Sequence, residues 1–466
     1  MPVRFVLSVF LRFGKFDIML TYNLKGKNKY YSLYSYIRDD ILNGKLKRGD
    51  KLPSKRALAE NLSVSVITVQ TAYDQLLAEG YVYSQERSGY FVADASFDFY
   101  GKRTLPPEQP ECEKKFEIDL VKGTATGLFP FSVWAKLMRR VLSDCGEHLL
   151  ERVPCDGDRE LKRAIASYLY RARAIDVDPR YVVIGAGAEY LYGVIVQLLG
   201  RDKVFAVENP GYGKISQSYR LNGAQCAFIN VIESGIDCGG VEASGADVLH
   251  FSPSHQFPTG AVTPASSRAR IISWANDGDK YVIEDDYDSE FRLSGKPLQC
   301  AYNLCPDRVI YMNTFSKSLA PSMRMGYMVL PPALYEKYLS LFGHSACVVP
   351  LFEQKTLAAM LDGGFFERHI SRLKNHYRTV RQAVLEKAAT LGIACEVDDN
   401  GSGLHLLAVF PDAPLDGYIK ARAAENGINV KCLSDYALAP ANIREKCAVI
   451  NYSGVTAEQI ASIKLK

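Results

Sequence analysis

From about residue 118 onward, short apolar runs alternate with stretches of helical periodicity, and this alternation limits the fold more than any other feature. Runs that are apolar throughout predict strands that are buried on both faces. Such strands, separated by helices, are typical of an α/β fold with a mainly parallel sheet, whose ligands bind beyond the carboxyl ends of the strands. The runs lie at residues 182–184, 204–207, 248–251, 281–283, 309–311 and 327–330.

The chain has 466 residues, so two or three domains are expected. Residues 95–116 show no apolar periodicity and carry Pro106, Pro107 and Pro110 among charged side chains, which predicts a semi-stiff linker. We therefore predict one domain at residues 29–94, a second at 117–466, and an N-terminal extension at 1–28 that is not structural. Met19 is a candidate for the true start of the chain.

Residues 29–94 have the pattern of three helices followed by a β-hairpin. Leu33, Ile37 and Ile41 share one helical face, and Asn43-Gly44 ends this first helix. Ser54 and Ser65 are predicted N-caps of two further helices that are separated by a short turn. The third helix carries an apolar stripe at i, i+3, i+4 and i+7, formed by Val69, Ala72, Tyr73 and Leu76.

Two short β-runs at 81–83 and 90–92 complete the layout of a winged helix-turn-helix. In that layout the helix after Ser65 enters the major groove of DNA, while helix N-termini and basic side chains hold phosphates. Ten Lys or Arg and three acids between Lys25 and Arg56 fit a phosphate-facing surface. A solvated helix face, or a winged helix used for protein contacts, would show the same pattern.

The segments Leu-Pro-Ser-Lys-Arg-Ala-Leu-Ala-Glu (52–60), Thr-Val-Gln-Thr-Ala-Tyr-Asp-Gln-Leu (68–76) and Ser-Gly-Tyr-Phe-Val (88–92) resemble GntR-type DNA-binding domains. The resemblance implies binding to double-stranded DNA. Members of that family often carry arginine after the serine that opens the recognition helix, and this chain has Val66 there, so base contacts are expected from other residues. The residues expected at the DNA are Ser54, Lys55, Arg56, Ser65, Thr68, Gln70, Tyr73, Arg87 and Gly89, with Thr68, Gln70 and Lys55 on the bases.

Cysteine usage and hydropathy bear on where the protein works. Eleven cysteines are scattered without a Cys-x-x-Cys pair, which favours reduced thiols and a cytoplasmic protein. No window holds eighteen or more consecutive apolar residues, so no membrane span is expected. The sequence predicts no metal site, and its net charge of +4 is too small to make the whole chain a nucleic-acid binder.

Residues 311–326 carry the strongest chemical signal. Lys317 stands with Thr314 and Ser316 directly after a predicted strand, and Arg324 follows seven positions later. A partly desolvated lysine has a lowered pKa and attacks aldehydes, whereas hydroxyls and an arginine suit a phosphate dianion. Pyridoxal 5'-phosphate (PLP) has both an aldehyde and a phosphate. An ordinary surface lysine in a Ser/Thr-rich loop would show the same residues.

Three further loops follow predicted strands and fit the same cofactor. Gly187 and Ala188 open a helix where backbone amides can approach a phosphate. Tyr212 lies on a turn from which its ring could stack on a flat heterocycle. Asp285 at a strand end can hold a pyridine nitrogen protonated, and Tyr287 can hydrogen-bond a ring oxygen. Acidic strand ends also bind magnesium, so this cluster alone is ambiguous.

Together these loops and residues 314–327 resemble the fold-type I aminotransferases, and more narrowly the MocR group of GntR-family regulators. The resemblance covers nearly all of residues 117–466 and implies a PLP-dependent fold-type I aminotransferase-like domain that forms a homodimer. It implies that Lys317 forms the Schiff base with PLP, that Asp285 faces the pyridine nitrogen, and that Tyr287 faces the ring oxygen. It also implies that Tyr212 stacks on the ring, and that the phosphate is held by Gly187, Ala188, Thr314, Ser316 and Arg324.

Two departures bear on activity. Phe257 stands where most aminotransferases place asparagine, and His255 is the candidate substitute, although a structural role is commoner for such a histidine. Val449 occupies the slot of the arginine that binds the substrate carboxylate, and Arg444 is five residues upstream. We therefore expect a transcriptional regulator that senses a small amine, an amino acid or PLP itself through Lys317. The alternatives are an active aminotransferase with an appended DNA-binding domain, and a degenerate domain that only dimerises.

Overall fold

The computed structural model describes residues 20–24, 28–93, 116–123, 126–293, 298–390, 393–398, 403–441 and 443–463. The chain divides into two compact units between residues 113 and 114. The predicted linker, residues 95–116, lies outside the described residues apart from Phe116. None of the described helices is long and apolar enough to cross a membrane.

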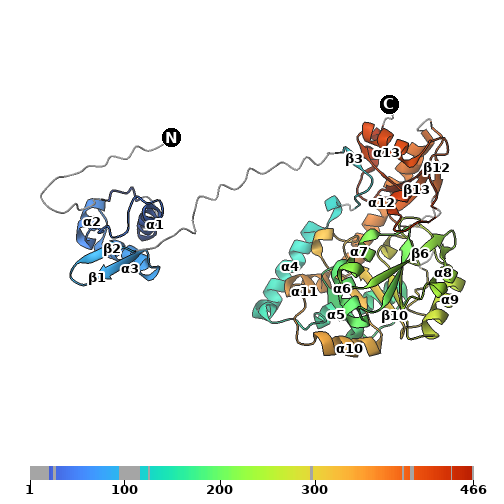
Figure 1. Cartoon of the computed structure of the whole chain (residues 1–466), viewed down its shortest axis with the longest axis horizontal. Coiled ribbons are helices and arrows are strands. Elements are labelled where there is room, and N and C mark those ends of the chain that lie inside the picture. Colours follow the sequence, from blue (N-terminus) through green and yellow to red (C-terminus); the bar gives the residue numbers. More distant parts are fainter. Residues whose placement is uncertain are drawn as a thin grey trace. The chain divides into compact units, whose positions relative to one another are not determined.

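The described part of the N-terminal unit is three helices and a β-hairpin (Figure 1). Two of the helices begin at the predicted caps, because Ser54 Oγ accepts a hydrogen bond from the Ala57 amide and Ser65 Oγ from the Thr68 amide. The winged helix-turn-helix is therefore confirmed. Its elements are α1 (Lys29–Leu42), α2 (Lys55–Leu62), α3 (Val66–Ala78), β1 (Val82–Gln85) and β2 (Gly89–Val92).

The apolar stripes of α1 and α3 meet in the core of this unit. Leu33, Val69 and Leu76 are fully buried there. Tyr73 lies in the same core, and its hydroxyl donates to the Pro53 carbonyl at 3.0 Å. The predicted contact between Tyr73 and DNA is therefore wrong, because both the ring and the hydroxyl already have partners inside the domain.

Residues 20–24 pack against this unit as well, so the prediction that residues 1–28 are not structural is wrong for this segment. Leu20 is buried in the core, and its carbonyl accepts a hydrogen bond from Asn61 Nδ2 at 2.8 Å. The Tyr22 hydroxyl donates to Asp40 at 2.8 Å, and its ring stacks on Tyr36 with the centroids 5.3 Å apart. The physical reason is period-two alternation, which turns every second side chain of this short extended segment toward the helices.

Truncating Leu20 to alanine should destabilise the N-terminal unit by about 2–4 kcal/mol, since a buried leucine is lost and the space refills only in part. Hydrogen exchange of the α1 and α2 amides in the full-length chain would measure the loss of protection. Thr21→Ala is the matched control, because Thr21 is exposed in the same segment. Equal protection in the two variants would contradict the assigned role of this segment.

The second unit is built on a sheet that has eight strands among the described residues, in the order β4-β11-β10-β9-β8-β5-β6-β7. β10, β9, β8, β5 and β6 run parallel, while β11 and β7 are antiparallel to their neighbours. The mainly parallel α/β fold is thus confirmed. The strands are β4 (Val182–Gly185), β5 (Val204–Asn209), β6 (Gln225–Ile232), β7 (Gly235–Ile236), β8 (Val248–Phe251), β9 (Tyr281–Asp285), β10 (Val309–Thr314) and β11 (Gly326–Val329).

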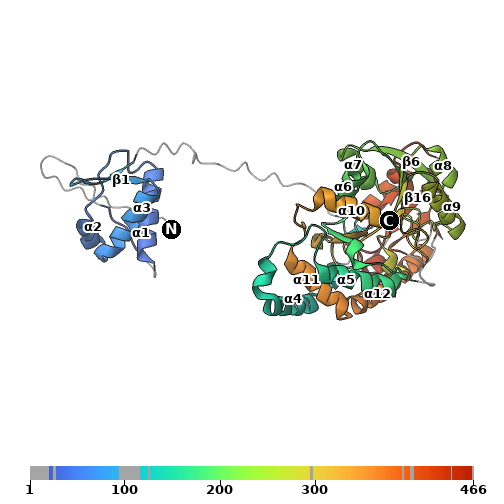
Figure 2. The same ribbon diagram turned by 90° about the horizontal axis from the view of Figure 1, so that it is seen from below.

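Alternate residues of these strands enter two separate cores, which explains why the runs are apolar throughout. Val183, Ile283 and Ile310 pack under one group of helices, and Val182, Val282 and Val309 under the other. The first group is α6 (Ala188–Leu199), α7 (Gly213–Leu221) and α10 (Pro332–Phe342); the second includes α5 (Arg159–Arg173), α9 (Ala265–Asn276), α11 (Leu351–Asp362) and α12 (Phe365–Thr390), with α4 (Phe131–Cys145) outside α11. In Figure 2, α6, α7 and α10 lie together, and α5, α11 and α12 lie together below them.

A smaller antiparallel sheet in the C-terminal region is not predicted by the sequence analysis. It has the order β12-β13-β16-β15 and packs against α12 and α13 (Figure 1), while α14 packs against α12. A two-stranded parallel pair, β3 with β14, joins it to the segment that follows the linker. The elements of this region are β3 (Ile118–Asp119), β12 (Glu396–Asp398), β13 (His405–Val409), α13 (Asp416–Glu425), β14 (Ile428–Asn429), β15 (Lys431–Cys432), β16 (Cys447–Asn451) and α14 (Ala457–Ser462), and the short α8 (Cys238–Ala243) lies beside α9.

Candidate functional site

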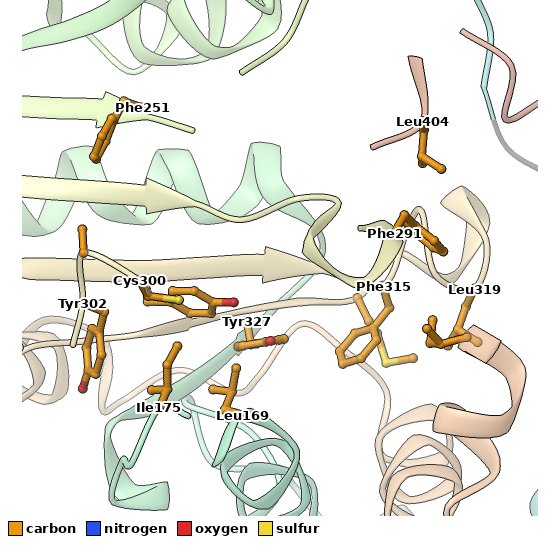
Figure 3. Packing of buried hydrophobic residues seen from close by; sticks show 14 of the residues in the cluster. Leu169, Ile175, Phe251, Phe291, Cys300, Tyr302, Phe315, Leu319, Tyr327 and Leu404 are labelled. Atoms are coloured by element: carbon orange, nitrogen blue, oxygen red, sulfur yellow. The ribbon is translucent and has the colours of Figure 1, made fainter. Parts of the chain in front are cut away.

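The loop that carries Lys317 is fixed on both sides by buried neighbours. Phe315 and Leu319 are buried in the core, and Figure 3 shows them beside Tyr327. The ring of Phe315 contacts those of Tyr327 and Phe366. The carbonyl of Ser318 accepts a hydrogen bond from His369 Nε2 of α12 at 2.9 Å. Because its flanks are anchored, the lysine has a defined position just past the carboxyl end of β10.

The Lys317 amine is held largely out of water. Its Nζ donates a hydrogen bond to the Gly123 carbonyl at 2.8 Å. Burial lowers the pKa of Lys317, and the attraction of the Asp288 carboxylate opposes this only in part. A larger fraction of neutral amine at a given pH makes Lys317 the best nucleophile for an aldehyde among the predicted site residues.

Asp285 lies at the carboxyl end of the neighbouring strand β9, where its backbone is in register with Met312 of β10. Its Oδ2 accepts a hydrogen bond from the Tyr192 hydroxyl at 3.0 Å and lies 3.4 Å from His250 Nε2. The Tyr219 hydroxyl in turn lies 2.6 Å from His250 Nδ1. These groups orient the carboxylate from behind, and the remaining oxygen is available for a ring nitrogen. The sequence analysis missed both His250 and Tyr192, although a histidine inside an apolar strand was the visible signal.

The N-terminus of α6 forms a concave polar surface with Arg324. Gly187 has a φ of +87° and no side chain to cap the helix, so the first amides of α6 are open to an anion. A Cβ on Gly187 would lie 3.1 Å from the Arg324 guanidinium, which shows how closely the arginine covers this turn. Glu189 pairs with Arg324 Nη2 at 3.5 Å and with Lys214 Nζ at 3.2 Å.

Thr314 completes this region of the sheet edge. Thr314 pairs with Gly326, and Gly326 pairs in turn with Gly185 of β4, so the polar end of β10 and the turn before α6 lie two strands apart. Ser316 follows two residues later and is partly exposed, like Thr314. The structure thus brings the predicted phosphate ligands, including Ala188 at the first position of α6, to one edge of the sheet.

The two predicted ring contacts come from the residue before α7 and from the turn after β9. Tyr212 stands before α7, is 46% exposed, and meets Phe257 edge-on with the centroids 6.1 Å apart. The Tyr287 hydroxyl lies 3.4 Å from His255 Nδ1. Burial and the Asp288 carboxylate raise the pKa of Tyr287 well above its ordinary value, so its hydroxyl keeps its proton and can donate.

A pair of histidines closes the site on the side of the C-terminal sheet. His255 Nδ1 lies 2.7 Å from Asp288 Oδ2, and the ring of His405 lies 4.5 Å from that of His255. Burial, together with His255 and Lys317, holds the pKa of His405 well below its ordinary value, so the ring is neutral. Its Nε2 is buried and has no hydrogen-bond partner among the described residues. His405 is a site residue that the sequence analysis missed.

Val449, which the resemblance aligns with the carboxylate-binding arginine of aminotransferases, has apolar surroundings. Val449 of β16 is buried with Leu407 of β13, and Phe257 packs against the same cluster. Arg444 is directed elsewhere, 3.5 Å from Asp398 and 3.9 Å from Glu396. The opposite face of this sheet, with Ala408, Ala448 and Ile450, lines a cavity of about 590 Å³ that contains none of the predicted site residues.

Glu208 at the end of β5 is a further titratable group beside the site. Its Oε2 accepts a hydrogen bond from the Ser252 amide at 3.2 Å, whereas Oε1 is buried without a partner among the described residues. Burial raises the pKa of Glu208 to about 8, and the charge of Asp285 adds to the shift. Glu208 is therefore mostly protonated at neutral pH.

The candidate DNA interface lies on the first turns of α2 and α3 and on the hairpin. Ser54, Arg56, Ser65 and Gln70 are exposed there. The wing tip between β1 and β2 carries the exposed Arg87, and Gly89 follows it with a φ of +117°. Lys55 Nζ lies 5.3 Å from the ring centre of Tyr90, and the Thr68 hydroxyl lies 2.8 Å from Ser65 Oγ.

Family models match both units. The model of bacterial regulatory proteins of the gntR family matches residues 29–92, and that of aminotransferase class I and II matches residues 119–461. The rhizopine catabolism regulatory protein MocR of Rhizobium meliloti is 30% identical over 455 residues, which cover 91% of this chain and 90% of that protein. The chain belongs to the MocR group of GntR-family transcriptional regulators.

Two further relatives match this chain over most of their own length. The HTH-type transcriptional regulator YdeL of Bacillus subtilis is 37% identical and covers 81% of this chain and 83% of its own. The HTH-type pyridoxine biosynthesis transcriptional regulator PdxR of Corynebacterium glutamicum is 31% identical, over 87% and 88% of the two chains. The kynurenine aminotransferase of Pyrococcus horikoshii superposes with a TM-score of 0.67 at 22% identity, over 75% of this chain and 89% of that one, and so shares the fold.

Glu208→Gln should stabilise this MocR-type regulator increasingly as the pH rises. The folded pKa of about 8 lies above the ordinary 4.5, so the contribution of Glu208 to stability is full below pH 4.5 and falls by about 1.4 kcal/mol per pH unit up to pH 8. Glutamine does not ionise, so the variant does not lose this contribution to stability as the pH rises. Urea unfolding at pH 5, 7 and 9 should show a gap that widens with pH and then levels off.

The exposed Glu233 supplies the control, because Glu233→Gln removes one carboxylate without removing a buried one. Its difference from the parent protein should stay constant over the same pH range. Parallel stability curves for Glu208→Gln and the parent protein would show that Glu208 is ionised in the folded state.

Proposed function

We propose that this regulator holds PLP on Lys317 and uses the loaded domain as a sensor that controls DNA binding. The observation that carries the proposal is the Lys317 amine, whose pKa is lowered at the same sheet edge as Asp285 and the Arg324-covered start of α6. The aminotransferase fold supports it, because that fold places cofactor chemistry at this edge.

The residues present fit the cofactor. When bound, PLP supplies an aldehyde and a protonated pyridine ring that draws electrons. Lys317 would hold the aldehyde carbon, Asp285 would accept a hydrogen bond from the ring nitrogen, and Tyr287 would donate to the ring oxygen. Tyr212 would cover the ring. The phosphate would lie against the amides of Gly187 and Ala188, with Thr314, Ser316 and Arg324 around it, where it would replace Glu189 as the partner of Arg324.

The side of the site that faces an effector would be built by the C-terminal sheet. The neutral His405 lies there, its buried Nε2 without a hydrogen-bond partner in the described part of the chain, and Phe257 and Val449 supply apolar surface. The effector is a small amine, an amino acid or PLP itself. The apolar Val449 slot and the outward position of Arg444 disfavour the alternative of an efficient aminotransferase, which needs a cation to bind the substrate carboxylate.

Further parts of the proposal concern the assembly. The DNA-binding domain comprises residues 29–94, the linker 95–116 and the sensor 117–466. We expect a cytoplasmic homodimer, in which two reading domains address two half-sites of double-stranded DNA. Effector binding then shifts the DNA affinity through the linker, with a coupling free energy of about 1–3 kcal/mol, typical of allosteric regulators.

Lys317→Ala should abolish covalent attachment of PLP, because no other predicted site residue supplies an amine with a lowered pKa. After incubation with PLP and borohydride reduction, peptide mass spectrometry should find the label on Lys317 in the parent protein and none in the variant. Before reduction, the parent protein with PLP should show an absorbance band near the edge of the visible range, and this band should be absent from the variant.

Lys337→Ala is the control, since Lys337 is an exposed lysine on α10, outside the site. It should leave the label on Lys317 unchanged. Stoichiometric labelling at another lysine, or no attachment in the parent protein at saturating PLP, would refute the cofactor role of Lys317.

The regulatory role is tested by titrating DNA at one fixed salt concentration, because phosphate contacts make the affinity strongly dependent on ionic strength. Duplexes selected from a random library by the full-length protein serve as the probe. PLP, alone or with members of a panel of amines, should shift the dissociation constant by about five-fold or more. Lys317→Ala should bind the same duplexes without this shift. An unchanged affinity under every condition would contradict the sensor role.

A further inference from the structure

The recognition helix α3 is unusual in what it lacks. Its thirteen residues, Val66–Ala78, include no lysine and no arginine. Bidentate arginine or lysine contacts to guanine are the commonest specific contacts in the major groove. A helix without these residues cannot read guanine in that way, so its specificity must come from other side chains.

The first turn of α3 instead presents apolar side chains to the outside. Ile67 is 77% exposed and Val66 is 43% exposed, while their neighbour Val69 is fully buried. These two adjacent branched residues lie outside the core at the start of the groove-facing helix, so their apolar surface is available for a partner to cover, and covering it would be favourable. In a major groove, the apolar partner is the 5-methyl group of thymine.

Most hydrogen-bonding side chains of α3 are already used within the domain. The Thr68 hydroxyl lies 2.8 Å from Ser65 Oγ, Thr71 Oγ1 donates to the Ile67 carbonyl at 2.9 Å, and Gln75 Nε2 donates to Glu79 at 3.1 Å. The exposed Gln70 has no side-chain hydrogen bond among the described residues. Its amide is therefore ready to bond a base, and glutamine pairs bidentately with the N6 and N7 atoms of adenine.

Spacing places these groups together. Gln70 follows Ile67 by three positions and Val66 by four, so the three side chains share one helix face over successive turns. We propose that this face reads a short run of T·A pairs, with Val66 and Ile67 against thymine methyl groups and Gln70 against an adenine. The inference rests on the DNA-binding function proposed above. Any guanine-specific contact then falls to Lys55, Arg56 or Arg87, which lie outside α3.

The test compares thymine with uracil, which differ only in the 5-methyl group. The full-length protein selects duplexes from a random library, and the best duplex is resynthesised with uracil at each thymine in turn. At one or two positions uracil should weaken binding by about four-fold, the value of one buried methyl group. Selected half-sites should carry adenine next to those positions, and Gln70→Ala should relax the adenine preference by about five-fold or more.

Ile67→Ala then separates the methyl contact from general DNA affinity. Ile67 is exposed, so the variant keeps its fold, and it should bind thymine and uracil duplexes equally at the position that Ile67 contacts. Leu77→Ala is the control, because Leu77 is 38% exposed at the far end of the same helix, and this variant should keep the uracil effect.

The outcomes are distinguishable. Sequence-specific binding with no uracil effect in the parent protein, or an undiminished effect in both Val66→Ala and Ile67→Ala, would overturn the thymine contact while leaving the proposed function intact. Selection of half-sites in which only G·C pairs are specified would overturn it as well. Absence of any DNA binding at low salt would overturn both proposals.

Discussion

An amine that is kept away from water at the end of a parallel sheet is the constraint on which the second unit depends. Water would hold Lys317 in its charged form, and its pKa is lowered only because the surrounding loops exclude solvent. That exclusion requires the buried flanks Phe315 and Leu319, and the contact between the amine and the Gly123 carbonyl. Packing in the core thus determines the chemistry at the edge.

A buried ion pair holds the chain in place at the strand ends beside Lys317. Arg173 at the end of α5 forms a 2.8 Å ion pair with Asp286, and the Tyr311 hydroxyl donates to the same carboxylate at 2.7 Å. Burying such a pair contributes little net stability, but removing one partner leaves an uncompensated charge and is strongly destabilising. The pair therefore fixes the chain directly after Asp285. The Asp285 carboxylate in this way keeps its position beside Tyr192 and His250.

Much of this architecture could be predicted from the sequence, because it depends on local signals. The six strand runs and the caps Ser54 and Ser65 are where the patterns place them. The C-terminal sheet was missed because its strands are short and their burial depends on partners distant in the chain, as for His405 opposite Asn451. Tyr73 belongs to the apolar stripe of α3, so the sequence pattern itself directs its ring into the core, and the predicted contact with DNA took account only of its place on the recognition helix.

The approach of His255 to His405 also depends on a long-range contact that no local pattern reveals. A Cβ on Gly403, where φ is +76°, would lie 1.8 Å from the His255 ring. Only a residue without a side chain permits this arrangement. Glycine at 403 is thus a requirement of a histidine that lies about 150 positions earlier in the chain.

The hydrogen bond from Lys317 to the Gly123 carbonyl connects the site to the start of the second unit. Gly123 is seven residues beyond Phe116, where the described part of the sensor begins, and the intervening β3 is a two-residue strand that pairs with β14. A reaction of the Lys317 amine that breaks its hydrogen bond to the Gly123 carbonyl would loosen the first stretch of chain after the linker. Occupancy of the pocket would then be transmitted to the other half of the protein along the covalent backbone, without a relay of side chains.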